Sequence, residues 1–373
     1  MRVAIVAECF LPALNGVTNS VLRTIEQLEH RGHDAIVIAP GDGPLRYGST
    51  PIERVPGVAL PMYKALSVAL PTRRVFDELE RFGPDVVHLA APFALGASGA
   101  RAAKQLGVPS IAIYQTDYAG FAARYGLTSL HPAVWRWLRH LHEMAARTLA
   151  PSTSASWQLQ QHGIGPVELW ARGVDLERFH PLHRSALLHR RLAGRDGVLV
   201  GYVGRLAKEK RVELLRHAAV PGVHLVVVGD GPARNRVARA VPGATFLGFL
   251  TGAALSEAVA SLDVFVHTGA DETFCQGVQE ALAAGVPVVA PACGGPLDLV
   301  RHGENGFLYP PDDPGQLAGA VRRLVAEPDL RRAMGSAARR SVEKRNWRVI
   351  GDQLLAHYEA VGGPRRRRCR RVA

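Results

Sequence analysis

The chain has 373 residues and a mass of 40.2 kDa, which is more than one hydrophobic core normally grows to, so two domains are expected. Hydrophobic residues make up 47% and charged residues 21% of the chain, and these values, close to those of soluble globular proteins, exclude general disorder. Six of the net +12 charges are arginines between positions 365 and 371, a cluster that suits an anionic surface or, equally, a solvated end.

Short β-branched runs alternate with longer helical stretches, which predicts parallel sheets covered by helices on both faces. The predicted strands cover residues 2–7, 35–39, 86–90, 110–114 and 147–150, and then 198–203, 224–228, 264–267 and 287–290. Helices are predicted at 72–82, 317–325, 329–341 and 347–361, and the basic, aromatic stretch 135–142 reads as a helix with a buried tryptophan side.

The pattern restarts at about residue 198, which indicates an α/β fold of two Rossmann-like, doubly wound domains facing a central cleft. We expect an N-terminal domain over 1–170, completed by the helix 347–361, a C-terminal domain over 171–346 and a basic tail over 362–373.

Neither a membrane span nor an export signal is predicted, because no apolar run reaches about 20 residues and the first strand lacks a signal peptide's layout. The four cysteines form no C-x-x-C pair, and the histidines form no H-x-x-x-H or H-E-x-x-H spacing. A cytoplasmic location without disulfides or a catalytic metal is expected.

The most informative stretch covers residues 271–290, in which Glu272 and Glu280 are separated by seven residues. We place Glu272 on the loop after a strand and Glu280 about two turns into the next helix, where the helical period would bring both carboxylates to a similar azimuth. One could hold sugar hydroxyls and the other a ribose. The backbone amides expected at the helix start, which would face anionic or hydroxyl oxygens, are those of Phe274, Cys275, Gln276 and Gly277.

A second constellation lies in residues 201–210, where a strand runs into a turn that carries Arg205 and Lys210. An Arg fork and a Lys point charge at a sheet edge could neutralise a pyrophosphate without a metal. The alternative is a surface basic turn that pairs with Glu209.

The loop 11–20 joins the first strand to its helix, with Asn15 and Gly16 suited to a sharp turn and Thr18 or Asn19 suited to capping. A phosphate could rest on its amides. The loop lacks G-x-G-x-x-G, which argues against a dehydrogenase.

These three stretches, together with residues 171–179, 228–232 and 294–300, resemble the retaining glycosyltransferases of the fourth sequence family, which have the GT-B fold. The resemblance covers residues 2–361 and is strongest to GDP-mannose-dependent α-mannosyltransferases of actinobacterial type that act on glycolipids. It implies GDP-mannose as donor, a lipid acceptor, retention of configuration and no cofactor. A front-face departure assisted by the leaving phosphate would need no protein nucleophile.

The resemblance also implies roles for individual residues. Gly16 would approach the donor phosphate, and Arg205 and Lys210 would hold the pyrophosphate. Glu272, with the amides of Cys275 and Gln276, would hold the sugar, while Glu280 would bind the ribose. Phe274 and Gly277 complete the donor-binding set.

Two positions depart from the family pattern. Gln115 stands where many relatives have a histidine near the reacting sugar, and glutamine cannot carry a proton at pH 7. A positioning role fits Gln115, and any acid or base role would pass to Asp117. Cys275 replaces a common glycine and adds a side chain beside the sugar site.

A lipid acceptor requires contact with a membrane, so we expect a peripheral protein on the inner face of the cell membrane. The basic residues expected to bind its anionic surface are Arg73, Arg74, Arg365, Arg366, Arg367 and Arg368. The alternatives are a UDP-sugar-dependent lipid glycosyltransferase, a sugar-nucleotide epimerase, and a nucleic-acid-binding protein that uses the tail. No recognised nucleic-acid module occurs, so no nucleic-acid partner is expected.

Overall fold

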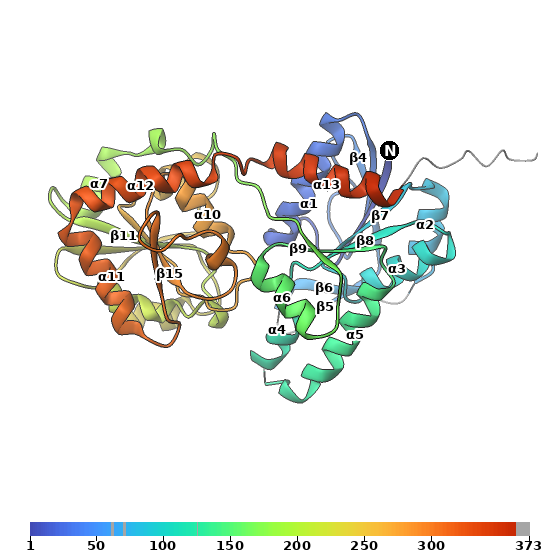
Figure 1. Ribbon diagram of the computed structural model, residues 1–373, viewed down its shortest axis with the longest axis horizontal. Coiled ribbons are helices and arrows are strands. Elements are labelled where there is room, and N and C mark those ends of the chain that lie inside the picture. The colour runs from blue at the N-terminus through green and yellow to red at the C-terminus, as the bar shows by residue number, and fades with distance from the viewer. Residues whose placement is uncertain (61–62, 70–71, 125, 363–373) are drawn as a thin grey trace, which may run out of the picture. The chain divides into compact units, whose positions relative to one another are not determined.

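The computed structural model describes residues 1–60, 63–69, 72–124 and 126–362. They form two compact units (Figure 1), the first comprising Met1–Ala171 with the segment from Arg348 onward and the second comprising Arg172–Trp347. The chain therefore crosses between the units twice. Among these residues, no helix is long and apolar enough to cross a membrane.

Unit 1 is built on an eight-stranded sheet in the order β10-β9-β8-β7-β1-β2-β4-β3. All neighbours are parallel except the pair β3 and β4. The strands are β1 (Arg2–Ala7), β2 (Asp34–Pro40), β3 (Arg46–Tyr47), β4 (Thr50–Val55), β7 (Val86–Ala90), β8 (Ser110–Ile113), β9 (Arg147–Ala150) and β10 (Val167–Leu169). A separate antiparallel hairpin consists of β5 (Gly57–Leu60) and β6 (Tyr63–Ala69).

The helices of unit 1 cover this sheet, and the last of them comes from the far end of the chain. They are α1 (Gly16–His30), α2 (Arg74–Phe82), α3 (Leu95–Gln105), α4 (Tyr118–Arg124), α5 (His131–Glu143), α6 (Thr153–Gln161) and α13 (Trp347–Gly362). Helix α13 lies beside α1 (Figure 1), where Asp352 accepts hydrogen bonds from Gln27 and Arg31. Its Tyr358 hydroxyl lies 2.5 Å from Nδ1 of the buried His88. As predicted, Trp135 of α5 is buried.

Unit 2 has a six-stranded parallel sheet in the order β13-β12-β11-β14-β15-β16. The strands are β11 (Val198–Val203), β12 (Val223–Val228), β13 (Thr245–Gly248), β14 (Val264–Val266), β15 (Val288–Pro291) and β16 (Gly306–Tyr309). The α-helices are α7 (Ala186–Ala193), α8 (Arg234–Ala240), α9 (Gly252–Ala260), α10 (Gln276–Ala283), α11 (Pro314–Ala326) and α12 (Pro328–Val342). The short 3-10 helix η3 (Lys208–Lys210) follows β11.

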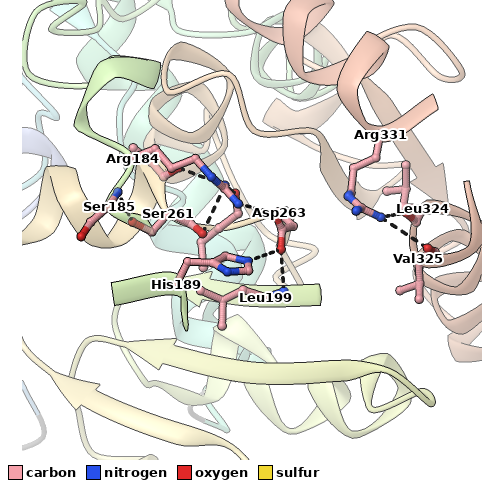
Figure 2. Close-up of polar contacts among 11 residues, drawn as sticks. Arg184, Ser185, His189, Leu199, Ser261, Asp263, Leu324, Val325 and Arg331 are labelled. Carbon is pink, nitrogen blue, oxygen red and sulfur yellow. Dashed lines mark hydrogen bonds and ion pairs between the residues drawn. The ribbon is translucent and has the colours of Figure 1, made fainter. Parts of the chain in front are cut away.

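A partly buried carboxylate fixes the amino-terminal edge of this second sheet. Asp263, just before β14, accepts hydrogen bonds from Arg184 at 2.6 Å, His189 at 2.7 Å and the Leu199 amide at 2.8 Å (Figure 2). Burial alone would raise the pKa of Asp263, but these donors lower it. Asp263 therefore stays ionised and holds helix α7 against the sheet.

The structure confirms the two Rossmann-like sheets and each predicted strand. Where an observed strand begins or ends at a different residue from the predicted one, the difference is one residue. Strands β3, β4, β5, β6, β10, β13 and β16 were missed. Charged Glu53 and Arg54 interrupt the apolar pattern of β4. No residue of β13 is buried, and β16 begins with a glycine. Short edge strands carry too little periodicity to be read from sequence.

Candidate active site

The carboxyl ends of β11 and β14 bring together the cation of one predicted motif and the carboxylate of another. Lys210 ends the 3-10 helix after β11, and its Nζ lies 2.5 Å from Oε1 of Glu272 on the loop after β14. Nε2 of the buried His267 lies 3.1 Å from the same oxygen. Residues 62 positions apart in sequence thus form one buried charge cluster.

The electrostatics of this cluster keep both partners ionised. Burial would raise the pKa of Glu272, but the ammonium of Lys210 and the ring of His267 lower it well below its usual range. Burial would likewise lower the pKa of Lys210, and the Glu272 carboxylate raises it instead. At neutral pH the pair is a fixed cation beside a fixed carboxylate.

Arg205 belongs to the same turn but has a different partner. Its guanidinium pairs with Glu209, as the alternative interpretation of this motif expected. The hydroxyl of the buried Tyr202 donates to the Arg205 carbonyl at 3.1 Å. The pKa of Tyr202 is raised well above its usual value by burial and then by the nearby carboxylate of Glu272.

Helix α10 corrects one detail of the predicted glutamate pair. It begins at Gln276, with Cys275 as its N-cap in the left-handed conformation at φ 82°. Glu272 lies on the loop, as predicted, but Glu280 is the fifth residue of the helix and not about two turns into it. The argument from helical azimuth therefore does not apply. Cys275 is buried, and burial followed by the Glu272 charge raises the pKa of its thiol well above the usual value.

Two glycines pack the Glu272 loop tightly against the turn after β15. A Cβ on Gly295 would lie 1.9 Å from the Phe274 carbonyl oxygen, and one on Gly294 would lie 2.6 Å from that of Glu272. The Gly295 amide donates to the Glu272 carbonyl at 2.8 Å. Only glycine permits this approach, which holds Glu272 and Phe274 in place.

In unit 1, Gly16 is the exposed first residue of α1. The cap of this helix is Asn15, whose side-chain oxygen accepts from the amides of Val17 and Thr18, both at 2.9 Å. The expected capping by Thr18 or Asn19 is therefore wrong, because Thr18 is buried inside the helix.

Gln115 and Asp117 follow β8 at the carboxyl edge of the unit 1 sheet. Gln115 is buried. The carboxylate of Asp117 accepts from the Gly120 amide at 2.8 Å and from the Tyr114 hydroxyl at 3.3 Å. Both contacts stabilise the start of α4, so Asp117 has a structural role.

A further carboxylate at this edge went unnoticed in the sequence. The buried Glu8, just after β1, accepts from the amides of Phe93, Leu95 and Gly96 at 2.6 to 3.1 Å. These amides open helix α3, where a carboxylate is stabilised by unpaired N–H groups. Its pKa is raised by burial despite those donors. Glu8 thus joins β1 to the loop after β7.

Three potential metal ligands lie close together in the part of the chain that the structure describes. His267, Glu272 and Cys275 each offer one ligand atom, all within 4.8 Å of one another. The ammonium of Lys210 already neutralises Glu272 at 2.5 Å, and a raised thiol pKa disfavours the thiolate that binds metals. This donor set fits an ion pair better than a resident metal.

The basic residues proposed for membrane contact lie partly outside the described residues. Arg73 and Arg74 are exposed at the start of α2, which begins at Arg74 and not at residue 72. Arg365, Arg366, Arg367 and Arg368 lie outside the residues that the structure describes.

Two family models match the chain, "Glycosyltransferase Family 4" over residues 14–178 and "Glycosyl transferases group 1" over residues 190–341. The chain is 49% identical, over 98% of both sequences, to a Mycobacterium tuberculosis protein named "GDP-mannose-dependent alpha-mannosyltransferase". The chain is a family 4 glycosyltransferase. A second protein of that species, "Phosphatidyl-myo-inositol mannosyltransferase", is 30% identical and covers 97% of this chain and 98% of its own.

The fold of this glycosyltransferase is the two-domain GT-B fold. The solved structure of Anabaena HepE in complex with UDP matches 96% of this chain and all of its own with a TM-score of 0.81 and 20% identity. That likeness extends over both units and agrees with the fold expected from sequence.

Some residues around the predicted site were not singled out in the sequence. Gln279 is one of them, and it donates to the Arg172 carbonyl at 3.0 Å, while the predicted residue Gln276 donates to the Gly173 carbonyl at 3.1 Å. Both contacts tie α10 to the point where the chain enters unit 2. Arg172 is buried, and burial lowers its pKa to about 10. His267 ends the predicted strand 264–267, Arg172 lies in the family-like stretch 171–179 and Gln279 lies in the stretch 271–290, but no pattern set these three side chains apart from their neighbours.

Proposed function

We propose that this glycosyltransferase moves mannose from GDP-mannose to a membrane glycolipid in an α linkage, with retention of configuration. The observation that carries the proposal is the partly buried Lys210–Glu272 pair just before α10, in a chain about half identical to a curated GDP-mannose-dependent enzyme. A pyrophosphate leaving group needs a positive charge aimed at it, and Lys210 provides one in a site that excludes most water.

In the proposed mechanism Lys210 exchanges part of its contact with Glu272 for a donor phosphate oxygen. Arg205, 36% of whose side chain is exposed, turns from Glu209 to the same pyrophosphate, and Gly16 and the amides at the start of α10 bind further oxygens. Glu272 then accepts hydrogen bonds from mannose hydroxyls, and Glu280 from the ribose. The departing phosphate takes the acceptor's proton, so no side chain forms a covalent intermediate.

We further propose that the reaction needs no metal. The charge of the departing GDP is offset by Lys210, Arg205 and the helix start, since hydrogen bonds to charged groups are each worth about 1.5 to 3 kcal/mol. What supports the proposal is that the ammonium of Lys210 already neutralises Glu272.

The acceptor is proposed to be a lipid that carries a sugar or an inositol, such as a glucuronosyl diacylglycerol or a phosphatidylinositol. Support comes from the more distant relative whose printed name includes phosphatidyl-myo-inositol. The enzyme would act from the cytoplasm as a peripheral protein, held by the exposed Arg73 and Arg74 and by the arginines of the tail.

Thermal unfolding against a panel of nucleoside diphosphates tests the donor. GDP at 100 times its dissociation constant would stabilise the chain by about 2.7 kcal/mol, whereas UDP at the same concentration should stabilise it much less. Stabilisation by UDP alone would replace the GDP-mannose proposal with the UDP-sugar alternative.

Co-sedimentation with vesicles tests the membrane part. The full chain should bind vesicles that contain phosphatidylglycerol, and binding should fall with salt. A chain that ends at Gly363 should bind less tightly yet keep its turnover on a detergent-dispersed acceptor. Equal binding by both chains would remove the tail from the proposal.

A further inference from the structure

The segment 178–195 of unit 2 is strongly basic and does not contribute to the donor site. It contains five arginines and three histidines and no acidic residue, the next acid being Asp196. It includes α7, which Asp263 holds at the amino-terminal edge of the sheet (Figure 2). Lys210 and Glu272 follow the carboxyl ends of the strands of that sheet, so this surface is a separate feature.

Two leucines on this segment are almost fully exposed. Leu182 is 86% and Leu187 is 80% exposed, more than any other large apolar residue in the described ranges. Leu187 shares one face of α7 with Arg190 and Arg191, which follow it by three and four residues. Ala193, on the other side of the helix, is buried. The outward face of α7 thus presents a leucine one turn before two arginines.

Some cations of this face have an ion-pair partner and others do not. Arg184 and His189 are bound to Asp263. Arg190, Arg191 and Arg195 are exposed, and none of them forms an ion pair with another described residue. A shallow hollow of about 260 Å³ lies between the bound and the free groups, lined by Arg184, Ala186, His189, Arg190, Gly194 and Arg195.

We propose that the face formed by Leu182, Leu187, Arg190, Arg191 and Arg195 is a membrane-contact surface of unit 2 that docks on anionic lipid. Free arginines attract acidic headgroups, and the exposed leucines of the same segment gain by entering the interface below them. The hollow has room for a headgroup phosphate. A nucleic acid would use the charge but leave both leucines in water.

The inference rests on the lipid-directed part of the proposed function, but its test does not measure transfer. Leu187→Trp places a fluorescent reporter on the face, and Phe249→Trp places one at another site of unit 2 where the native side chain is 68% exposed. The emission of the parent chain is subtracted from both. With phosphatidylglycerol vesicles, Leu187→Trp should shift to the blue and Phe249→Trp should not, and neither should respond to phosphatidylcholine vesicles.

Charge removal supplies the matched comparison. In the Leu187→Trp chain, Arg190→Ala, Arg191→Ala and Arg195→Ala should each weaken partition onto the vesicles about fivefold, the factor that about 1 kcal/mol per basic residue represents. Arg239→Ala and Arg322→Ala, exposed arginines of α8 and α11, should leave the Leu187→Trp blue shift in place.

The results separate this inference from the proposed function. An unchanged Leu187→Trp emission, with or without sedimentation of the chain, would overturn the inference, as would an equal shift for Phe249→Trp. A blue shift in a chain that transfers no sugar would leave the inference standing and remove the proposed function. A variant that combines Arg190→Ala, Arg191→Ala and Arg195→Ala should retain turnover on a detergent-dispersed acceptor, because it leaves Lys210 and Glu272 in place.

Discussion

Replacing Lys210 by methionine removes the cation of the active site while keeping a side chain of similar length. Loss of one donor aimed at the leaving group typically costs about 2.7 to 4 kcal/mol of transition-state stabilisation, so turnover should fall by about 100- to 1000-fold. Arg205→Ala should lower turnover by a similar factor if both cations hold the pyrophosphate. The measurement is kcat with saturating donor.

The two variants should differ in stability. Lys210→Met leaves the carboxylate of Glu272, only 15% exposed, without its cation, and breaking a buried pair costs about 3 kcal/mol or more. Arg205 is 36% exposed, so loss of its pair with Glu209 should cost about 1 kcal/mol or less. Denaturant unfolding of both variants measures this difference.

A double variant separates stability from chemistry. Lys210→Met with Glu272→Gln removes both charges, so most of the lost stability should return while turnover stays low. Turnover of Lys210→Met within a few-fold of the parent would refute the leaving-group role. Recovery of turnover in the double variant would show that the single substitution acts only through folding.

The directions in which folding shifts the pKa values of Glu272 and Lys210 determine how the stability that this pair contributes depends on pH. The pKa of Glu272 is lowered on folding, so its stabilisation is present above the unfolded value of about 4.3 and is lost as pH falls toward the folded value. The pKa of Lys210 is raised, so its stabilisation is present below about 10.4 and is lost at higher pH. The stability difference between the parent and the double variant should be flat from about pH 5 to 9. A steep change within that window would contradict the assigned ion pair.

Three other predictions concern the glutamates, metals and the loop glycine. Glu280→Ala should raise the donor KM through lost ribose contacts, and Glu272→Ala should mainly lower kcat; a change in KM alone for both would remove the sugar role of Glu272. Excess chelator should leave the rate unchanged, whereas complete loss that is restored by magnesium or manganese would contradict charge neutralisation by side chains. Gly295→Ala should destabilise unit 2 by about 3 kcal/mol because its Cβ would meet the Phe274 carbonyl at 1.9 Å. Gly243→Ala is the control, since a Cβ there would meet no atom within 4 Å. Equal melting temperatures for the two variants would show that the loop adapts.

Sequence periodicity predicted the two sheets well because their central strands are continuous buried apolar runs. Strands such as β1 and β15 are buried along nearly all of their length, and such runs are typical of parallel sheets. The edge strand β13 lacks this signal because none of its residues is buried, and the edge strand β16 begins with a glycine, which is uncommon in strands.

The site was predicted in its parts but not in its pairing. Sequence spacing identified Lys210 and Glu272 separately, yet only the sheet order, which places β14 beside β11, brings them within 2.5 Å. Because Cys275 has the left-handed conformation, α10 begins only at Gln276. No sequence pattern predicts that conformation at a cysteine. His267 was overlooked because a single histidine after a strand is more often a packed core residue than a site residue.

Transfer of label from donor to lipid tests the central claim most directly. The purified chain would be incubated with GDP-mannose labelled in the sugar and with membrane lipid, beside the same reaction with labelled UDP-sugars and beside the Lys210→Met variant. The account predicts that label enters the organic phase from GDP-mannose, in an α linkage, and that Lys210→Met abolishes nearly all of it. Label that stays in the aqueous phase, or enters lipid only from a UDP-sugar, would contradict it.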